Sequence, residues 1–257
     1  MEILVCIKQV PDDSVEIRMN PQSGQPDLSQ ADLQGNAFDT YAQELAVRYI
    51  EANGGSVTVC SVGGEENKTC LKNALAVGAK RAYLILHPEG AADDPASTAE
   101  ILAAAIPEIE AAAGITFDLV LCGKESTDYI DGETAEYLAE RLGYPFTSNI
   151  VEINPLESGI AAKKELDDGY QIVETPLPAL MTVSKPDYDP RYPTIKTKLS
   201  ARKMPIPTII AEKSTPCVKY LGFREPQKRA AGVKIQEEEA ADAVAQAMKI
   251  MISRKII

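Results

Sequence analysis

Apolar residues along the first 143 positions form short runs, and each run is followed by a longer segment in which apolar residues recur with helical spacing. Short runs of this kind indicate buried strands, and the spacing of Ala135, Leu138 and Leu142 indicates a helix. The predicted strands are residues 3–7, 56–62, 81–86 and 117–121, and the predicted helices are residues 36–53, 67–77, 97–113 and a segment from about residue 134.

Successive strand-helix units build an α/β fold, because each helix returns the chain to the same edge of a parallel sheet by a right-handed crossover. We therefore predict the α/β class. The expected architecture is a doubly wound, mostly parallel, Rossmann-like sheet between two helical layers, of the type that binds adenine nucleotides.

The second half of the chain has a different pattern. Segments 146–153, 160–166 and 170–175 alternate or run apolar around tight turns, which predicts antiparallel strands at the edge of the sheet. Segment 178–184 is mostly apolar and is predicted to return to the core. Five prolines in residues 185–208 exclude continuous regular structure, so an exposed loop with a short helix inside it is predicted there.

The last fifty residues hold too few apolar side chains for a core of their own. Residues 209–231 are predicted to form an extended arm, and residues 236–250 an amphipathic helix. The predicted division is a nucleotide-binding α/β domain over residues 1–208, followed by the arm and helix over residues 209–257. The terminal helix could dock on its own domain or on a different chain.

Charge and hydropathy exclude several classes of protein. Lys and Arg number 26 against 38 Asp and Glu, and the net charge of −12 disfavours nucleic acid or an anionic membrane as a partner. The first residues, MEILVCIKQV, lack the regions of a signal peptide. No apolar stretch approaches the roughly 20 residues of a transmembrane helix. We predict a cytoplasmic protein that does not insert into a membrane.

Residues suited to metal binding or acid-base catalysis are scarce. The five cysteines are odd in number and never spaced as CxxC, so neither a disulfide framework nor a metal site is predicted. His87 is the only histidine, and the GxSxG and P-loop motifs are absent. No catalytic residue is assigned, and a cofactor is expected to supply any chemistry.

The carboxyl ends of the four predicted strands meet at one edge of the sheet, where α/β proteins bind ligands. The fourth loop, residues 123–134, begins with Gly123, which would let a ligand approach the backbone closely. Amides at the following helix N-terminus suit a phosphate. Asp39 or Asp128 could accept a ribose hydroxyl or cap a helix. The hydroxyls that could bind phosphate oxygens belong to Ser126, Thr127 and Thr134.

One group of motifs is specific enough to indicate a family. The most specific is LPALMTVSKPDYDPRYP (177–193), followed by SARKMPIP. The others are VCIKQVPD (5–12), NAFD (36–39), CLKNALAVGA (70–79), CGKESTD (122–128) and GET (132–134). From Glu2 to about Pro207 the chain resembles the beta subunit of electron transfer flavoproteins. Its DLSQAD segment (27–32) is similar to the Fix-type and anaerobic members.

The resemblance implies a heterodimer with an alpha subunit that holds an FAD and contacts the C-terminal arm and helix of this chain. It also implies electron exchange with an acyl-CoA or other flavin dehydrogenase. In the electron-bifurcating branch the beta pocket holds a second FAD, NADH is the donor, and ferredoxin or flavodoxin is an acceptor. We expect FAD in this pocket. The alternatives are AMP, as in conventional members, or a non-redox adenine-nucleotide binding module.

Carried over residue by residue, the family's pocket falls on strand ends, the start of the first helix and the fourth loop. Asp94 and Thr98 are similar to an acidic residue and threonine pair of bifurcating members. Alternatively, Asp94 caps the third helix and Thr98 is a first-turn residue. The other implied pocket residues are Cys6, Asn36, Ala37, Phe38, Asp39, Val62, Gly123, Lys124, Glu125, Ser126, Thr127, Asp128, Asp131, Gly132, Glu133 and Thr134.

Two positions depart from the family. Residues 10–13 resemble the loop that faces the alpha flavin, but Asp13 stands where bifurcating members often have threonine. A negative charge there would lower the reduction potential of a nearby flavin. Residues 185–188 stand in the loop that anchors partner dehydrogenases, where many members have a leucine. Tyr188 could supply an apolar anchor or be a solvent-exposed turn residue.

Overall fold

The computed structural model describes residues 1–12, 14–87, 94–211, 214, 216–225, 227 and 231–257. These residues divide into two compact units, Met1–Gly222 and Phe223–Ile257, and each is described by itself. Asp13, predicted to lie near a flavin, and residues 88–93 of the predicted third loop lie outside the described residues.

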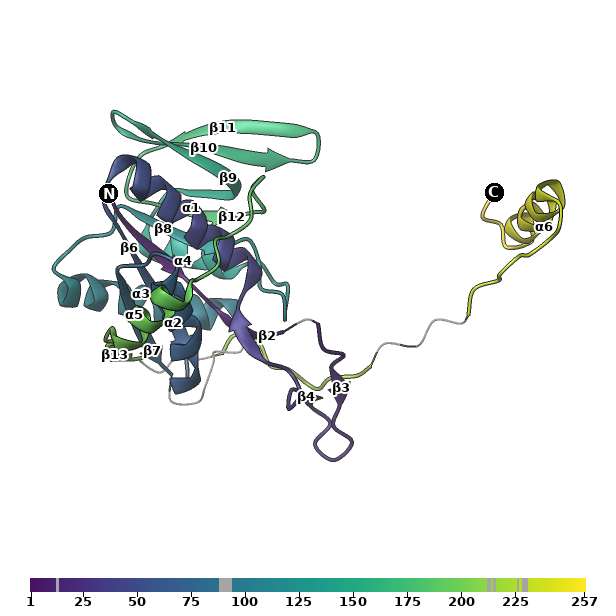
Figure 1. The fold of residues 1–257 in the computed structure, drawn as a ribbon, viewed down its shortest axis with the longest axis horizontal. Coiled ribbons are helices and arrows are strands. Elements are labelled where there is room, and N and C mark those ends of the chain that lie inside the picture. Colours follow the sequence, from purple (N-terminus) through teal and green to yellow (C-terminus); the bar gives the residue numbers. More distant parts are fainter. Residues whose placement is uncertain (13, 88–93, 212–213, 215, 226, 228–230) are drawn as a thin grey trace. The chain divides into compact units, whose positions relative to one another are not determined.

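The described part of the first unit contains a nine-stranded sheet (Figure 1). The order is β11 (Gly169–Thr175), β10 (Gly159–Leu166), β9 (Phe146–Leu156), β12 (Ala179–Val183), β8 (Leu119–Gly123), β1 (Glu2–Cys6), β6 (Ser56–Gly63), β7 (Arg81–Leu86) and β13 (Thr208–Ile210). In this order, all neighbouring pairs from β9 to β13 are parallel, and the antiparallel pairs lie at the β11 edge, which confirms the predicted α/β class.

Two strands differ from the prediction. β9 was predicted as one of three antiparallel strands at the edge of the sheet, and it is antiparallel to β10 as predicted but parallel to β12 on its other side. A helix separates β8 from β9, and such a crossover returns the chain in the same direction. β13 falls in the predicted arm. It has only three residues and follows Pro207, so it leaves no recognisable strand pattern, yet it pairs with the edge of β7.

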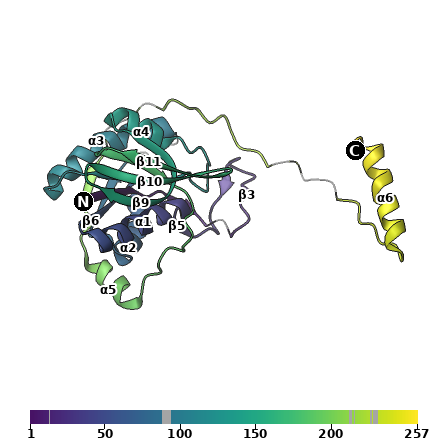
Figure 2. The ribbon, with the colours of Figure 1, turned by 90° about the horizontal axis from the view of Figure 1, so that it is seen from above.

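Two helical layers cover the sheet (Figure 2). Along β1, Ile3 and Val5 face the core under α1 and α2, whereas Leu4 and Cys6 face the core under α3 and α4. This alternation confirms the doubly wound architecture, because a strand buried on both faces contributes to two cores. The helices are α1 (Ala37–Asn53), α2 (Lys68–Ala76), α3 (Pro95–Ala113) and α4 (Thr134–Leu142), and the short helix η1 (Glu65–Asn67) precedes α2.

Smaller elements extend from this core. Between β1 and α1, strand β2 (Gln9–Pro11) pairs with β5 (Leu33–Gly35), and β3 (Arg18–Met19) pairs with β4 (Pro26–Asp27). α5 (Ile195–Lys203) is the short helix predicted inside the proline-rich segment, and a capping box of Thr194 and Thr197 starts it.

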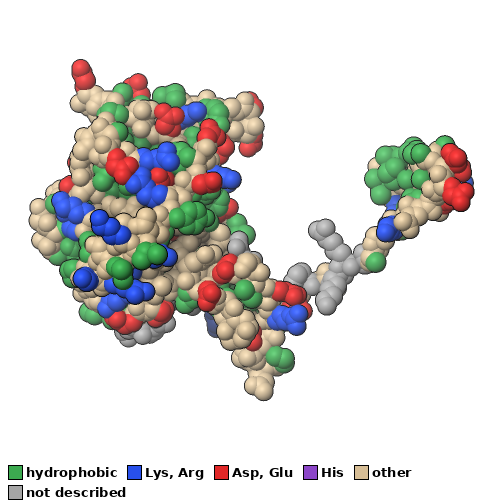
Figure 3. Space-filling view, viewed as in Figure 1, with side chains coloured by type: hydrophobic (Ala, Val, Ile, Leu, Met, Phe, Trp, Pro, Cys, Tyr) green, Lys and Arg blue, Asp and Glu red, His purple; other side chains and the backbone are tan. Residues whose placement is uncertain are grey.

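The second unit contains α6 (Ala240–Ser253), which begins four positions after its predicted start. None of its residues is buried. Hydrophobic side chains gather on one side of this helix (Figure 3), and its one acidic residue, Asp242, lies in the first turn. The exposed apolar side chains include Val244, Met248 and Ile252, which follow one another at four-residue spacing.

Candidate functional site

A cleft lies at the carboxyl ends of β1, β6 and β8, next to the first turns of α1, α3 and α4. Its volume is about 950 Å³, including the part open to solvent. This is the edge of the sheet at which the sequence predicts a nucleotide site. Of the residues predicted for that site, those that line the cleft are Cys6, Asn36, Asp39, Val62, Asp94, Thr98, Gly123, Lys124, Glu125, Ser126, Asp131, Gly132 and Thr134.

The other predicted site residues, Ala37, Phe38, Thr127, Asp128 and Glu133, do not line the cleft. Each of them is a sequence neighbour of a residue that lines the cleft. The lining residues that the sequence reading missed are Ile7, Lys8, Cys60, Pro95, Leu102, Cys122, Tyr129 and Ala135.

Three thiols form a row on the floor of the cleft. Cys6 is in register with Cys60 on β6, and the pairing of Val5 with Leu121 puts Cys122 on its other side. The sulfurs of Cys60 and Cys6 are 3.8 Å apart. The contact with Cys6 and burial raise the pKa of the Cys122 thiol, so it stays protonated. Neutral, polarisable thiols of this kind suit contact with a flat aromatic ring.

Asp39 joins β1 and β8 to the start of α1. Its Oδ2 accepts the Lys8 N–H at 2.7 Å, and its Oδ1 accepts the Gly123 N–H at 2.8 Å. Burial raises the pKa of Asp39 to about 6, although these two hydrogen bonds act in the opposite direction. Asp39 does not cap α1, whose N-cap is Asn36, so the capping role considered for Asp39 is wrong.

Gly123 is required for the packing of α1, whereas its expected role in letting a ligand approach the backbone stays a prediction. A Cβ on Gly123 would lie 2.7 Å from both the Asp39 nitrogen and the Phe38 carbonyl carbon. The close approach at this glycine is therefore that of the α1 N-terminus. The absence of a side chain lets Asp39 reach the Gly123 amide, and through that bond β8 and α1 are held together.

Asn36 shapes the loop between β8 and α4. It is 1% exposed, its Nδ2 donates to the Glu125 carbonyl at 2.8 Å, and its Oδ1 accepts the Thr127 N–H at 3.1 Å. Further along this loop Gly132 has a φ of 69°, a left-handed conformation that favours glycine. Asn36 thereby fixes the wall of the cleft that leads into α4.

Lys8 brings a positive charge to the same loop. Its Nζ lies 2.7 Å from Asp128 Oδ1, 3.4 Å from Ser126 Oγ and 4.6 Å from the ring centre of Tyr129. Asp128 thus pairs with Lys8 and caps no helix. Lys8 has no periodic signal in the sequence, because it is the second residue after β1 and its contacts form only when the loop between β8 and α4 folds over it.

The first turn of α4 faces the cleft through Thr134 and Ala135. Its N-cap residue, Glu133, makes no side-chain capping hydrogen bond. The first amides of a helix have no partner within the helix, and the helix dipole is positive at this end. This end of the cleft is therefore suited to a phosphate group.

Asp94 caps α3 and also holds a distant segment. Its Oδ1 accepts the Ser97 N–H at 2.8 Å, and its Oδ2 accepts the Cys217 N–H at 3.0 Å. The Thr98 hydroxyl donates to the Asp94 carbonyl at 3.0 Å. The structure thus shows the capping arrangement that was one of the two alternatives for Asp94 and Thr98. Burial raises the pKa of Asp94 and these hydrogen bonds lower it, with a net decrease.

A contact between aromatic rings brings the same distant segment to the opposite wall of the cleft. The ring centres of Tyr220 and Tyr129 are 5.5 Å apart. Residues 217–220 therefore contact two residues that line the cleft, Asp94 and Tyr129.

Tyr188 is half-buried at the surface of the core. Its ring packs against the core that contains α1, Arg48 stacks on it at 3.9 Å, and its hydroxyl is buried. Burial raises the pKa of Tyr188 to about 12. The half-buried ring does not fit the expected solvent-exposed turn residue, and the expected role of Tyr188 as an anchor for a partner stays a prediction.

Two features are absent from the residues that the structure describes. No cluster of His, Cys, Asp or Glu side chains among them could hold a metal ion. No helix within the same ranges is long and apolar enough to cross a membrane.

A mostly parallel sheet with a cleft at the carboxyl ends of its strands defines a doubly wound α/β protein, a class that binds ligands at this edge of the sheet. The profile of the electron transfer flavoprotein domain matches residues 29–214, which is more than half of the chain. The chain belongs to the electron transfer flavoprotein beta-subunit family.

Individual relatives agree with this assignment. The electron transfer flavoprotein subunit beta of Megasphaera elsdenii is 31% identical over 280 aligned positions, which cover 100% of each chain. The caffeyl-CoA reductase-Etf complex subunit CarD of Acetobacterium woodii is 32% identical over 80% of this chain and 77% of its own. Protein FixA of Azorhizobium caulinodans is 34% identical over 71% of this chain and 66% of its own.

Proposed function

We propose that this chain is the beta subunit of a heterodimeric electron transfer flavoprotein and that its cleft binds the adenosine and phosphate parts of an FAD. The observation that carries the proposal is that surfaces suited to a flat ring and to phosphates lie in one cleft. Three thiols line the same cleft as a loop with a cation, hydroxyls and a helix start that has no side-chain cap.

Each part of the nucleotide has a matching surface. The thiols of Cys6, Cys60 and Cys122 suit the flat adenine ring. The first amides of α4 and the Lys8 ammonium suit the phosphates. Asn36 and Asp39 act indirectly, because their polar atoms hold the loop and the strand ends in place.

A flavin bound there would supply hydride acceptance from NADH and one-electron transfer, which together are the chemistry of electron bifurcation. The residues of this chain would hold and orient the cofactor and perform no acid-base step. The names of two relatives support a redox role, since CarD belongs to a reductase-Etf complex and a 29% identical protein of Anaerotignum propionicum is an acryloyl-CoA reductase electron transfer subunit.

The second candidate is AMP in the same cleft, in a structural role. The hydrogen bonds that Asp94 accepts favour AMP. Both oxygens of that carboxylate already accept protein hydrogen bonds, so Asp94 has less capacity left for a larger cofactor. Electron transfer would then depend on the flavin of the alpha subunit alone.

Cofactor analysis of the co-expressed heterodimer separates the two candidates. The dimer is denatured, and the released FAD and AMP are quantified by chromatography. Two FAD per dimer would support the proposal, one FAD with one AMP would establish the second candidate, and one FAD without AMP would overturn both. The Lys8→Ala variant should retain less of the nucleotide in the beta cleft while the alpha flavin stays bound.

We also propose that the C-terminal unit binds the alpha subunit. α6 has an exposed apolar stripe and no buried residue, and a helix with such a stripe gains stability by covering it. The names of the relatives as subunits of Etf complexes agree with a second chain.

The partner dehydrogenase is proposed to bind residues 191–204, called here the docking segment. Tyr192, Ile195 and Leu199 in this segment are 91%, 81% and 53% exposed. Lysine and arginine side chains of α5 surround them (Figure 3), although the chain as a whole is acidic. This combination fits a dehydrogenase surface with an apolar pocket and an acidic rim.

A further inference from the structure

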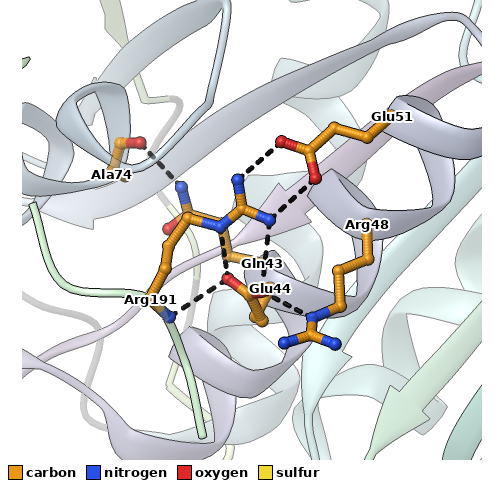
Figure 4. Close-up of polar contacts among 6 residues, drawn as sticks. All are labelled: Gln43, Glu44, Arg48, Glu51, Ala74 and Arg191. Atoms are coloured by element: carbon orange, nitrogen blue, oxygen red, sulfur yellow. Dashed lines mark hydrogen bonds and ion pairs between the residues drawn. The ribbon is translucent and has the colours of Figure 1, made fainter. Parts of the chain in front are cut away.

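Arg191 fastens the start of the docking segment to α1. Figure 4 shows its guanidinium between the carboxylates of Glu44 and Glu51. Its Nε is 2.8 Å from Glu44 Oε2, and its Nη1 and Nη2 are 2.6 and 2.9 Å from the two oxygens of Glu51. Its own backbone N–H also donates to Glu44, at 3.2 Å. A forked contact of this kind fixes both the position and the orientation of the chain.

Glu44 is a buried carboxylate that depends on arginine. Its side chain is 3% exposed, and Arg48 binds its other oxygen at 2.6 Å. Burial raises the pKa of Glu44, but the hydrogen bonds from Arg191 and Arg48 lower it by more, so the net shift of the pKa is downward. A charge that is buried and paired in this way holds its partners firmly, because separation would leave it without compensation.

Lys72 fastens the other end of the same segment. From α2, its Nζ donates to the carbonyls of Ala201 and Arg202 at 3.2 Å each and to that of Met204 at 2.5 Å. The last carbonyls of a helix have no partner within it, and the dipole is negative there. Lys72 therefore stabilises the C-terminal end of α5 from outside.

α5 needs both attachments. It has nine residues, and Ala201 is the only buried one among them. Helices shorter than about 12 residues are marginal in water without tertiary packing. The three apolar side chains proposed to contact the dehydrogenase point into solvent, so their burial does not stabilise the free helix.

We infer that Arg191 and Lys72 are positioning residues that hold the docking segment in its binding conformation before the dehydrogenase arrives. Such preorganisation lowers the entropy cost of association and improves affinity without a direct contact. The inference rests on the proposed role of the docking segment. It assigns the recognition strength of Tyr192, Ile195 and Leu199 partly to the ion pairs between Arg191 and α1 and to the hydrogen bonds from Lys72 on α2.

The first test measures amide hydrogen exchange of residues 195–203 in the heterodimer. Arg191→Ala and Lys72→Ala should each speed exchange there by at least about tenfold, because each removes charge-assisted hydrogen bonds. Arg191→Lys should recover only part of the loss, since it keeps the charge but not the fork. Glu51→Gln serves if Arg191→Ala does not fold. Lys68→Ala, which removes a cation from an exposed pair with Glu65, should leave the exchange unchanged.

The second test measures electron transfer with an acyl-CoA dehydrogenase from the same genome. Arg191→Ala should raise the KM for the dehydrogenase about tenfold with kcat nearly unchanged, as expected for lost preorganisation. Ile195→Asp tests the surface itself. If Ile195→Asp has no effect, the proposed docking surface is wrong. If Ile195→Asp raises KM but Arg191→Ala changes neither KM nor hydrogen exchange, the surface stands and the positioning role is refuted.

Discussion

Asp39 is a buried carboxylate whose two oxygens connect separate elements, and its titration should affect stability. Its pKa is about 6 in the folded protein against 3.8 when unperturbed. A group with a raised folded-state pKa contributes stability that is fully present below pH 3.8 and is lost as the pH rises through about 6. The difference between the two pKa values corresponds to about 3 kcal/mol.

Asp39→Asn should therefore cost most at acidic pH. The amide places an N–H group against one of two backbone N–H donors, which costs about 1–3 kcal/mol. Since the wild type loses the contribution of Asp39 as the pH rises from 4 to 7.5, the difference between the proteins should shrink over that interval. Urea unfolding at both pH values measures it. A cost that grows toward neutral pH would contradict the raised pKa.

Gly123 offers a second test at a single residue. Gly123→Ala would push a methyl group into the backbone of α1 and should destabilise the protein by about 1–3 kcal/mol, the usual cost of overpacking. Gly35→Ala is a matched control, because its Cβ would lie 3.6 Å from its nearest neighbour, Ile7, and its φ is not in the left-handed region. Thermal unfolding compares the two. Equal effects would refute the close approach of α1 as the reason for Gly123.

Among the elements, those with strong periodicity followed the sequence closely. The strand over residues 81–86 has the predicted bounds, and α1 starts one residue after its predicted start. The failures were elements defined by a distant partner. β13 is a strand only because β7 offers it an edge, and the direction of β9 depends on the crossover before it.

For the site, the sequence predicted its position in the sheet but not its individual side-chain contacts. Strand ends and a glycine-led loop indicated which edge of the sheet holds the cleft. The contacts of Lys8, Asp39 and Tyr188 were not predictable, because each joins residues more than 30 positions apart or depends on which way one side chain turns. Local patterns carry no information on such pairs.

The start of α3 provides a prediction about an element, because Asp94 both caps the helix and holds Cys217. Asp94→Asn keeps a good N-cap, so the free energy of unfolding should change by less than about 0.5 kcal/mol. It replaces one carboxylate oxygen with an amide donor, and the Cys217 amide should then exchange faster with solvent. Asp94→Ala should also speed exchange at the Cys217 amide, and it should lower the free energy of unfolding by about 1 kcal/mol. Unchanged exchange at Cys217 in both variants would show that Asp94 does not hold this segment.

For the whole molecule, the distribution of apolar side chains indicates that folding depends on the first unit and assembly on the second. The first unit contains both hydrophobic cores, so its fold does not depend on the C-terminal unit. The second unit has no buried helix residue and exposes its apolar stripe, which makes it suited to another chain. Changes on α6 should therefore affect assembly and leave the stability of the first unit intact.

Val244→Asp tests this separation in the full chain. A charge on the apolar stripe would be buried against the alpha subunit without a partner, which should weaken the heterodimer by at least about 2 kcal/mol, or roughly thirtyfold in Kd. Gln246→Asp introduces the same charge on another side of α6 and should change Kd less than about threefold. Sedimentation with the alpha subunit gives both values, and the melting temperature of the free beta chain should be the same for both variants. Equal Kd values for the two variants would mean that the stripe is not the contact surface, and a lower melting temperature for Val244→Asp would mean that α6 packs on its own chain.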